Sequence, residues 1–251
     1  MKAIILAAGK GTRLTPFTDN FPKGMIKLFD KTLIEMQIEN FQMCGIDDIT
    51  IVTGYKSEKI SFPKIKIKKN EFFDSTNMNE SLFCVKDELN ESVIISYSDI
   101  VYDKLIINQL IDFKEDVGIA VRTKWKDDYA DRSLHPISEA ENVLYENEKI
   151  LKIQKNISEK TSEQEIGEFL GLIKLSKNGC KIFLETYYNL SRQNLDKFHS
   201  SKSLKEAYLT DMIQEIIDLG NNVEIIQTDA KWFEIDTMED IKNVREKLGK
   251  F

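Results

Sequence analysis

The sequence predicts an α/β fold in which a mostly parallel central sheet is covered by helices on both faces, in three Rossmann-like layers. Short apolar runs alternate with amphipathic segments of helical period, which is typical of βαβ units. The apolar runs do not alternate with polar residues, as expected for strands buried on both faces. With 251 residues and 41% hydrophobic content, the chain is long enough to bury one large core.

The first half contains four expected strands and three expected helices. The strands are residues 3–6, 49–52, 93–96 and 118–121, and the helices are residues 33–43, 82–89 and 105–113. Thr32 and Glu35 form a capping box before the first helix, and Gly45 follows it where a helix-ending glycine belongs.

The second half begins with a polar, weakly periodic segment over residues 124–167, which we expect to be a smaller insertion or lid. A short strand is expected at 149–153 within it, and further strands at 169–175, 223–228 and 232–235. One helix is expected at residues 181–190. A second is expected to begin at a cap formed by Ser203 and Glu206 and to end before Gly220, and a third to begin at a cap formed by Thr237 and Asp240. We therefore expect one domain over residues 1–251.

Composition limits the classes of partner. A net charge of −7, with both signs interspersed, gives no electrostatic footprint for nucleic acid or an anionic membrane. The apolar run at residues 3–8 is far shorter than the roughly 20 residues that span a bilayer. Three widely separated cysteines form neither a disulfide framework nor a metal site. We expect a cytoplasmic protein with a small-molecule partner.

A turn of small residues directly follows the first strand, at the carboxyl edge of the sheet where ligands bind in open α/β folds. Small side chains let backbone N–H groups approach a triphosphate closely. Arg13 and Lys23 add positive charge, although a bare Gly-x-Gly also fits an ordinary tight turn. The stretch is Leu6, Ala7, Ala8, Gly9, Lys10, Gly11, Thr12 and Arg13.

Two common phosphate-binding motifs do not fit this turn. A dinucleotide fingerprint needs a third glycine three residues after Gly11, where Leu14 stands. A P-loop needs serine or threonine directly after Gly-Lys, but Lys10 is followed by Gly11.

Residues 1–23 resemble the signature of the nucleoside-diphosphate-sugar pyrophosphorylase superfamily, an apolar strand followed by LAAGxGTRLxPxT and then PK. The matching residues are Leu6, Ala7, Ala8, Gly9, Gly11, Thr12, Arg13, Leu14, Pro16, Thr18, Pro22 and Lys23. The resemblance implies that the loop from Leu6 to Thr12 binds the nucleotide and that Arg13 holds the triphosphate. It implies that Lys23 neutralises charge at the reacting phosphates.

Two aspartates follow predicted strands and suit a divalent cation. Asp99 comes after residues 93–96 and Asp236 directly after residues 232–235, so both are expected at the edge that carries the phosphate loop. Mg²⁺ commonly takes one or two protein carboxylates and completes its shell with water and phosphate oxygens. The family resemblance implies that Asp99 and Asp236 share the metal.

An Asn-rich turn at residues 77–81 is similar to the base-reading segment of small cytidylyltransferases. Amide side chains can pair with both the donor and the acceptor edges of cytosine. The resemblance makes Asn77 and Ser81 candidates for base recognition, although both also suit an ordinary helix cap.

The second half contains several short motifs: Trp125, Tyr129, Arg132, His135-Pro136, Glu139-Ala140-Glu141, Lys155, Gly167 to Gly171, Tyr208 to Asp211 and Trp232 to Thr237. Together they resemble the cytidylyltransferases of phosphonate and capsule pathways. The resemblance implies transfer of CMP from CTP to a small phosphate or phosphonate acceptor with an amino end. Phosphoglutamine, giving CDP-L-glutamine, is the preferred acceptor, and aminoethylphosphonate and phosphocholine remain open. An acceptor of this kind needs a cation near phosphorus and a carboxylate near the ammonium. The candidates are Arg132 and Lys155 for the first, and Glu168 and Asp211 for the second.

Two other functions share much of this pattern. A sugar-1-phosphate nucleotidyltransferase using UTP or dTTP would have the same phosphate loop, and the base-reading segment disfavours it. A nucleotide-sensing subunit without activity would not need a complete metal site. The presence of both Asp99 and Asp236 therefore disfavours this function. The sequence leaves the oligomeric state open, a homodimer included.

Overall fold

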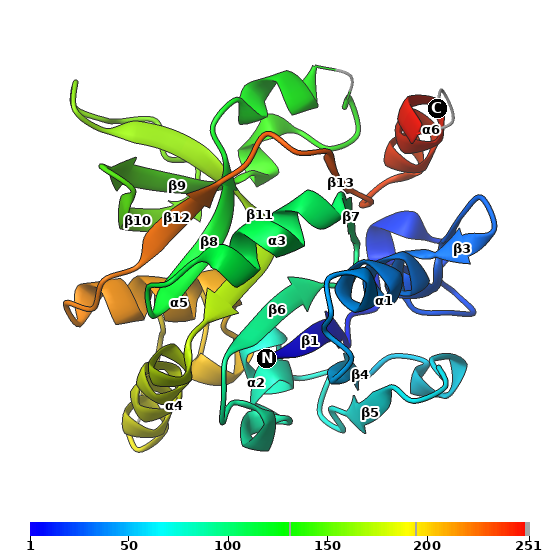
Figure 1. Ribbon diagram of the computed structural model, residues 1–251, viewed down its shortest axis with the longest axis horizontal. Coiled ribbons are helices and arrows are strands. Elements are labelled where there is room, and N and C mark those ends of the chain that lie inside the picture. The colour runs from blue at the N-terminus through cyan, green and yellow to red at the C-terminus, as the bar shows by residue number, and fades with distance from the viewer. Residues whose placement is uncertain (131, 194, 249–251) are drawn as a thin grey trace.

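The computed structural model describes residues 1–130, 132–193 and 195–248, within which nine strands form one sheet (Figure 1). Their order across the sheet is β5-β4-β1-β6-β11-β8-β12-β10-β9. The bounds are β1 Lys2–Ala7, β4 Ile49–Thr53, β5 Lys66–Lys69, β6 Val93–Tyr97, β8 Val117–Arg122, β9 Glu141–Glu146, β10 Lys149–Lys155, β11 Glu165–Leu175 and β12 Glu224–Gln227.

The predicted parallel sheet surrounds β1, which runs parallel to both β4 and β6. β11 runs antiparallel to its neighbours β6 and β8, so the sheet is mixed beyond this point. Two short ribbons lie apart from the main sheet. They pair β2 Lys27–Leu28 with β3 Lys31–Thr32, and β7 Ile100–Tyr102 with β13 Trp232–Glu234.

Helices cover both faces of the sheet, as predicted. Figure 1 shows α1 and α3 on the near side of the sheet and α5 behind it. The bounds are α1 Leu33–Met43, α2 Met78–Phe83, α3 Lys104–Asp112, α4 Lys177–Ser191, α5 Leu209–Asp218 and α6 Met238–Leu248. In the described part of the chain, none of these helices combines the length and apolar content needed to cross a membrane.

Two of the predicted caps are confirmed. The Glu35 N–H donates to Thr32 Oγ1 at 3.1 Å, and the Thr32 N–H donates back to Glu35 at 2.7 Å. At α6, the Asp240 N–H donates to Thr237 Oγ1 at 3.3 Å. Asp240 in turn accepts from the Thr237 N–H at 2.7 Å. These reciprocal bonds satisfy N–H groups that the first helical turn leaves unpaired.

Two predicted helices were placed wrongly. The helix expected at 82–89 is instead α2, which ends at Phe83, followed by a 3-10 turn at Lys86–Glu88. Leu82, Val85 and Leu89 are buried here, and one continuous helix would also bury them. Their spacing therefore could not distinguish a long helix from a short helix followed by a 3-10 turn. Ser203 caps only a 3-10 turn, Leu204–Glu206, and α5 begins later.

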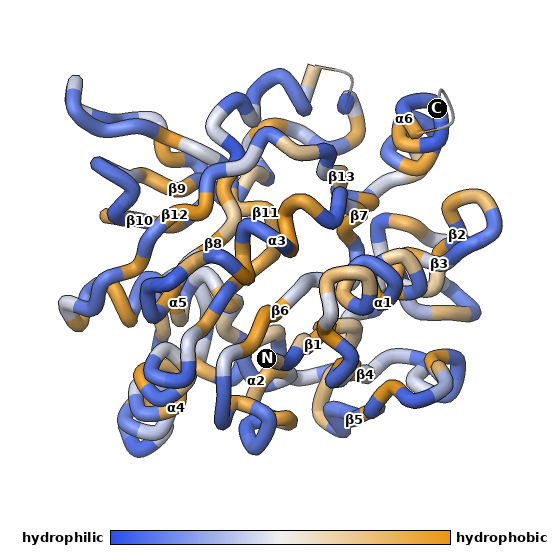
Figure 2. The backbone as a smooth tube through the Cα atoms, in the orientation of Figure 1, coloured by the Kyte–Doolittle hydropathy of each residue, from blue (hydrophilic) through white to orange (hydrophobic). Residues whose placement is uncertain are grey.

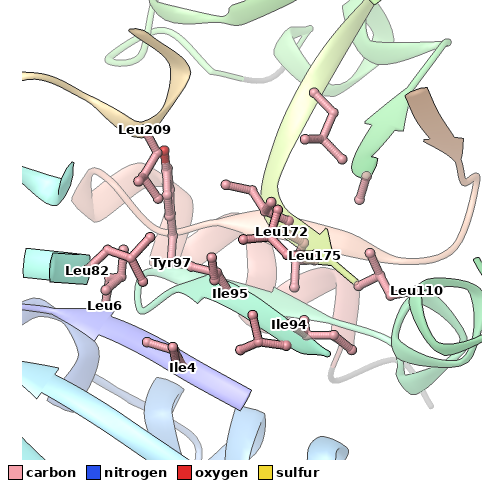
Figure 3. Close-up of a cluster of buried hydrophobic side chains, with 14 of the residues drawn as sticks. Ile4, Leu6, Leu82, Ile94, Ile95, Tyr97, Leu110, Leu172, Leu175 and Leu209 are labelled. Carbon is pink, nitrogen blue, oxygen red and sulfur yellow. The ribbon is translucent and has the colours of Figure 1, made fainter. Parts of the chain in front are cut away.

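The core lies around the central strands, which appear as hydrophobic segments in Figure 2. Figure 3 shows side chains of β1, β6 and β11 meeting those of the flanking helices, among them Leu6, Ile95, Leu172 and Leu209. Each fully buried Leu or Ile contributes roughly 1.5–3 kcal/mol of hydrophobic free energy. This core holds rigid the carboxyl ends of β1 and β6, from which the loops of the candidate site extend.

The segment 124–167 supplies β9 and β10, and β10 pairs with β12 at the sheet edge. β9 also pairs with β11, which folds this part of the sheet back over the strand ends. Trp125, Tyr129 and Ala140 form a small apolar cluster beside it. The Trp125 indole donates to the Ile166 carbonyl at 3.1 Å, so this side chain packs against the start of β11.

Candidate active site

A cavity of about 320 Å³ opens where β1 and β6 end. Its wall combines the loop after β1, the segment after β6, the β9–β11 region and the strand before α6. The lining residues are Leu6, Gly9, Gly11, Thr12, Arg13, Lys23, Met78, Tyr97, Ser98, Asp99, Ile100, Tyr129, His135, Glu139, Glu141, Lys155, Glu168, Phe169, Leu170, Gly171, Tyr208, Trp232, Glu234 and Asp236.

The loop after β1 is shaped by Gly11, whose φ of +63° lies in the left-handed region that favours glycine. Thr18 Oγ1 donates to the Gly11 carbonyl at 2.9 Å and closes the loop on itself. A Cβ at Gly9 would meet nothing within 4 Å, so the backbone here is open to a ligand. Ala7 is buried in β1 and Ala8 is half-buried at its end, so both support the loop from below.

Lys23 lies between the two predicted metal carboxylates. Its ammonium group donates to Asp99 Oδ2 at 2.6 Å and to Asp236 Oδ1 at 2.5 Å. The Arg13 guanidinium approaches the other oxygen of Asp236 at 2.5 Å. A backbone bond of 2.9 Å from the Ile235 N–H to the Asp99 carbonyl joins the two chain segments. The structure thus brings together four residues, of which Arg13 and Asp236 lie 223 positions apart in the sequence.

The charges in this cluster determine each other's protonation. Burial by itself would lower the pKa of Lys23, but the negative charges of Asp99, Asp236 and Glu234 outweigh it and raise that pKa. Burial by itself would raise the pKa of Asp236, but His135 and Lys23 lower it well below the usual range. The cluster therefore holds a charged ammonium and a charged carboxylate in contact at neutral pH.

Glu234 and His135 also belong to the site, although the sequence analysis gave them no role. His135 Nδ1 lies 3.1 Å from Asp236, and its Nε2 lies 3.6 Å from Glu234. Glu234 precedes Asp236 by two residues at a strand end, so the two-residue period of a strand was a usable signal. His135 lies in a loop but is only 2% exposed, and no spacing in the sequence indicated its position.

Buried polar groups form the opposite wall. Glu168 is 3% exposed and accepts a short hydrogen bond from the Tyr129 hydroxyl. Burial is the main cause that raises the pKa of Glu168 to about 8. Glu141 accepts from Thr210 Oγ1 at 3.1 Å, and burial raises its pKa to about 7. These carboxyl groups are poised to gain or lose a proton when a charged ligand enters.

Two predicted acceptor ligands, Arg132 and Asp211, lie outside the lining of the cavity. The Arg132 guanidinium is buried against Asp240 at 2.8 Å and Glu234 at 3.2 Å, behind the wall of the site. Asp211 accepts from Ser200, Ser201 and the Tyr208 N–H, so its oxygens are used to cap α5. Sequence charge alone could not distinguish these internal ion pairs and caps from ligands.

The proposed base-reading residues lie beside the cavity rather than in its wall. Asn77 caps α2 by accepting from the Met78 N–H at 2.9 Å, and its amide donates to the Glu206 carbonyl at 3.2 Å. Ser81 is buried and accepts from the Asn70 amide at 3.1 Å. Asn77 lines a separate hollow that shares Tyr208 with the main cavity.

Comparison with known proteins agrees with this geometry. The family model described as Nucleotidyl transferase matches residues 2–250. CTP:phosphoglutamine cytidylyltransferase of Campylobacter jejuni subsp. jejuni serotype O:2 is 33% identical over 253 residues, covering 96% of this chain and 98% of that protein. Choline-phosphate cytidylyltransferase of Streptococcus pneumoniae is 40% identical over 114 residues, which is 44% of this chain and 50% of that protein.

Solved structures show the same fold. The CTP:phosphocholine cytidylyltransferase structure from Streptococcus pneumoniae superposes with a TM-score of 0.72 at 24% identity, over 98% of both chains. The inositol-1-phosphate CTP transferase structure from T. maritima gives 0.73 at 19% identity, over 99% of this chain and 95% of that one. The match of nearly the whole chain to the family model, together with the phosphate loop and its acidic cluster, shows that this protein belongs to the nucleotidyl transferase family.

Proposed function

We propose that this enzyme transfers CMP from CTP to the phosphate or phosphonate of a small amino-bearing acceptor and releases pyrophosphate. The proposal rests mainly on one observation: the Lys23 ammonium group lies between Asp99 and Asp236, and the Lys23 side chain packs against Gly11 of the phosphate loop. The choice of CTP is supported by the cytidylyltransferases to which the chain is similar. We propose phosphoglutamine as the acceptor, in a capsule pathway, because that relative covers the chain from end to end.

The chemistry requires positioning and charge neutralisation. An oxygen of the acceptor phosphate forms a bond to the α-phosphorus of CTP, and the bond from that phosphorus to the α–β bridging oxygen breaks. Pyrophosphate leaves with the electron pair of the broken bond. Because the attacking oxygen is already ionised, no proton needs to be removed, so Lys23 and Arg13 act by offsetting the charge that gathers on the phosphoryl oxygens.

Asp99 and Asp236 fit the requirements of a divalent cation. The two carboxylates converge on the position that the Lys23 ammonium group now occupies. Carboxylate oxygens are the protein ligands that Mg²⁺ prefers. Asp236 Oδ2 lies 2.5 Å from the Arg13 guanidinium and 3.1 Å from His135 Nδ1, so these two groups would orient the carboxylate toward a bound cation. Bound Mg²⁺ would neutralise phosphate charge and orient the triphosphate. We propose that Lys23 then turns from the carboxylates toward the phosphates.

The acceptor would occupy the end of the cavity that Lys155 lines, where Glu139 lies between Lys155 and the Arg13 guanidinium. Lys155 lines this end and is the cation that we propose for the acceptor phosphorus, since Arg132 is committed behind the wall. Lys155 is now held by Glu139 at 2.7 Å, an exposed pair that a phosphate group can displace at little cost. Buried carboxyl groups at the same end, Glu168 and Glu141, are available for an amino group.

Pyrophosphate release in the presence of Mg²⁺ tests the proposal. CTP, UTP, dTTP and ATP would each be offered with phosphoglutamine, aminoethylphosphonate, phosphocholine and glucose-1-phosphate. We expect release with CTP and an amino-bearing acceptor only. Turnover of glucose-1-phosphate with UTP or dTTP would assign the protein to the sugar-nucleotide branch. No release in any combination would favour a nucleotide-sensing role without catalysis.

A further inference from the structure

The hairpin of β9 and β10 places opposite charges side by side at the acceptor end of the cavity. Glu141 and Lys155 are directly paired across the two strands, and both line the cavity. Residues paired in this way have Cβ atoms about 5 Å apart on one face of the sheet. They do not use each other as partners, because Lys155 pairs with Glu139 and Glu141 with the Thr210 hydroxyl.

A second polar group in the same wall has no partner. The Tyr97 hydroxyl is buried and makes no hydrogen bond within the described residues, although Tyr97 lines the cavity and is 9% exposed. Figure 3 shows its hydroxyl end pointing toward Leu209, at the start of α5. Leu209 is followed by Thr210, whose hydroxyl donates to Glu141 at 3.1 Å, so the Tyr97 hydroxyl and the Glu141 carboxylate both face the start of α5. An unpaired buried hydroxyl destabilises the protein, so binding of a ligand that bonds to it is favoured.

We propose that Glu141 and Tyr97 bind the primary ammonium group of the acceptor, while Lys155 binds its phosphate or phosphonate. The subsite rests on the proposed transfer of CMP, and it adds the chemical class of the acceptor and the residues that select it. A primary ammonium has three N–H donors for the carboxylate and hydroxyl oxygens of Glu141 and Tyr97. A quaternary ammonium has no N–H donor, so its binding would leave the oxygens of Glu141 and Tyr97 without hydrogen bonds.

Glu168 is the other candidate carboxylate in the cavity wall. One of its oxygens accepts from the Tyr129 hydroxyl, and the other is buried without a hydrogen-bond partner among the described residues. Glu168 is 3% exposed, whereas Glu141 is half-buried and lies directly across from Lys155 on the neighbouring strand. We therefore place the ammonium group at Glu141, beside the lysine that binds the phosphate, and the Glu168→Gln variant tests this choice.

The wild-type protein tests the class of acceptor with two matched pairs, phosphoethanolamine against phosphocholine and phosphoglutamine against its α-N-acetyl form. Each pair keeps the phosphorus centre and changes only the amine. We expect kcat/KM to fall about tenfold or more on methylation or acetylation, in line with sites built to bond a donor that is then missing. Equal rates within both pairs would overturn the subsite and leave the cytidylyltransferase proposal intact. Absence of any pyrophosphate release from CTP would instead contradict the proposed function itself.

Variants test the assignment of residues. Glu141→Gln and Tyr97→Phe are expected to reduce the preference for the free amine about tenfold or more, with an unchanged Kd for CTP measured by titration. Glu146→Gln is the matched control, because it makes the same change on the same strand outside the cavity wall. An unchanged amine preference in both variants, or its loss in Glu168→Gln alone, would overturn the assignment. If Glu141→Gln does not fold, Tyr97→Phe and the acceptor pairs still decide.

Discussion

A methyl group on Gly11 would lie 2.9 Å from Cβ of Lys23, so the phosphate loop and the lysine between the acidic residues are in direct contact. The loop therefore determines where the lysine stands. Because the close atom is Cβ and not the far end of the side chain, Lys23 cannot avoid the methyl group without moving its own backbone.

Gly11→Ala is predicted to reduce kcat by at least about tenfold, because displacement of about 1 Å at a catalytic group can cost up to 100-fold. The change also places a non-glycine residue at left-handed φ, which costs about 1–2 kcal/mol. Gly45→Ala is the matched control, since Gly45 has a φ of +78° and nothing within 4 Å of the new methyl. Thermal unfolding should show destabilisation of both variants, larger for Gly11→Ala because of the added contact with Lys23, and kcat should fall in Gly11→Ala alone. A similar kcat for the two would show that the contact with Lys23 is unimportant.

Lys23→Ala is predicted to lower kcat about 100- to 1000-fold, the usual effect of removing one donor that stabilises transition-state charge. It also leaves Asp99 and Asp236 facing each other without the cation between them. Mg²⁺ should therefore raise the melting temperature of this variant more than that of the parent protein. Calorimetry with and without Mg²⁺ measures this difference, and an equal shift in both proteins would argue against a metal at these carboxylates.

Asp99→Asn is predicted to raise the Mg²⁺ concentration needed for half-maximal rate by at least about tenfold, because one anionic ligand is lost. Pyrophosphate release measured against Mg²⁺ concentration gives the value. Asp103→Asn is a suitable control, since Asp103 caps α3 through the Leu105 N–H and does not line the cavity. Mg²⁺ dependence that is unchanged in Asp99→Asn would remove Asp99 from the metal site.

Arg132→Ala is predicted to destabilise the protein by about 3–5 kcal/mol, since it removes the cation from the buried carboxylate of Asp240 and from the half-buried Glu234. Lys155→Ala should change the free energy of unfolding by less than about 1 kcal/mol, because its pair with Glu139 is exposed. The same Lys155 variant should raise KM for the acceptor. Urea unfolding and acceptor titration separate the two effects, and an unfolding free energy that Arg132→Ala leaves unchanged would contradict the internal role of Arg132.

The pKa of Glu168, raised to about 8, predicts a pH-dependent stability. Between about 4.5, its unfolded value, and 8, the folded protein holds a proton that the unfolded chain releases, so stability falls as pH rises. Glu168→Gln removes this titration. The melting temperature of the variant relative to the parent should therefore be higher at pH 9 than at pH 5, when measured without ligands. A difference that does not vary with pH would show that Glu168 is ionised in the folded protein.

The sequence by itself determined the features that depend on local pattern. The glycine-rich turn after an apolar strand indicated the phosphate loop, and Thr32 with Glu35 marked the start of α1 to the residue. Asp99 and Asp236 were predicted as partners because both follow strands that end at one edge of the sheet. In each case the physical signal, such as a cap, a turn or the end of a strand, lies within a few residues.

Only the tertiary structure decided how individual charges are used. The sequence contained no signal that separates charged residues in internal ion pairs from those that line the cavity. Arg132 and Asp211 make internal ion pairs and hydrogen bonds, whereas Lys155 and Glu168 line the cavity. The pairing of Glu141 with Lys155 depends on the register of β9 and β10. Ion pairs and register join residues far apart in the chain, and burial determines their protonation, so these properties follow from packing and not from local sequence.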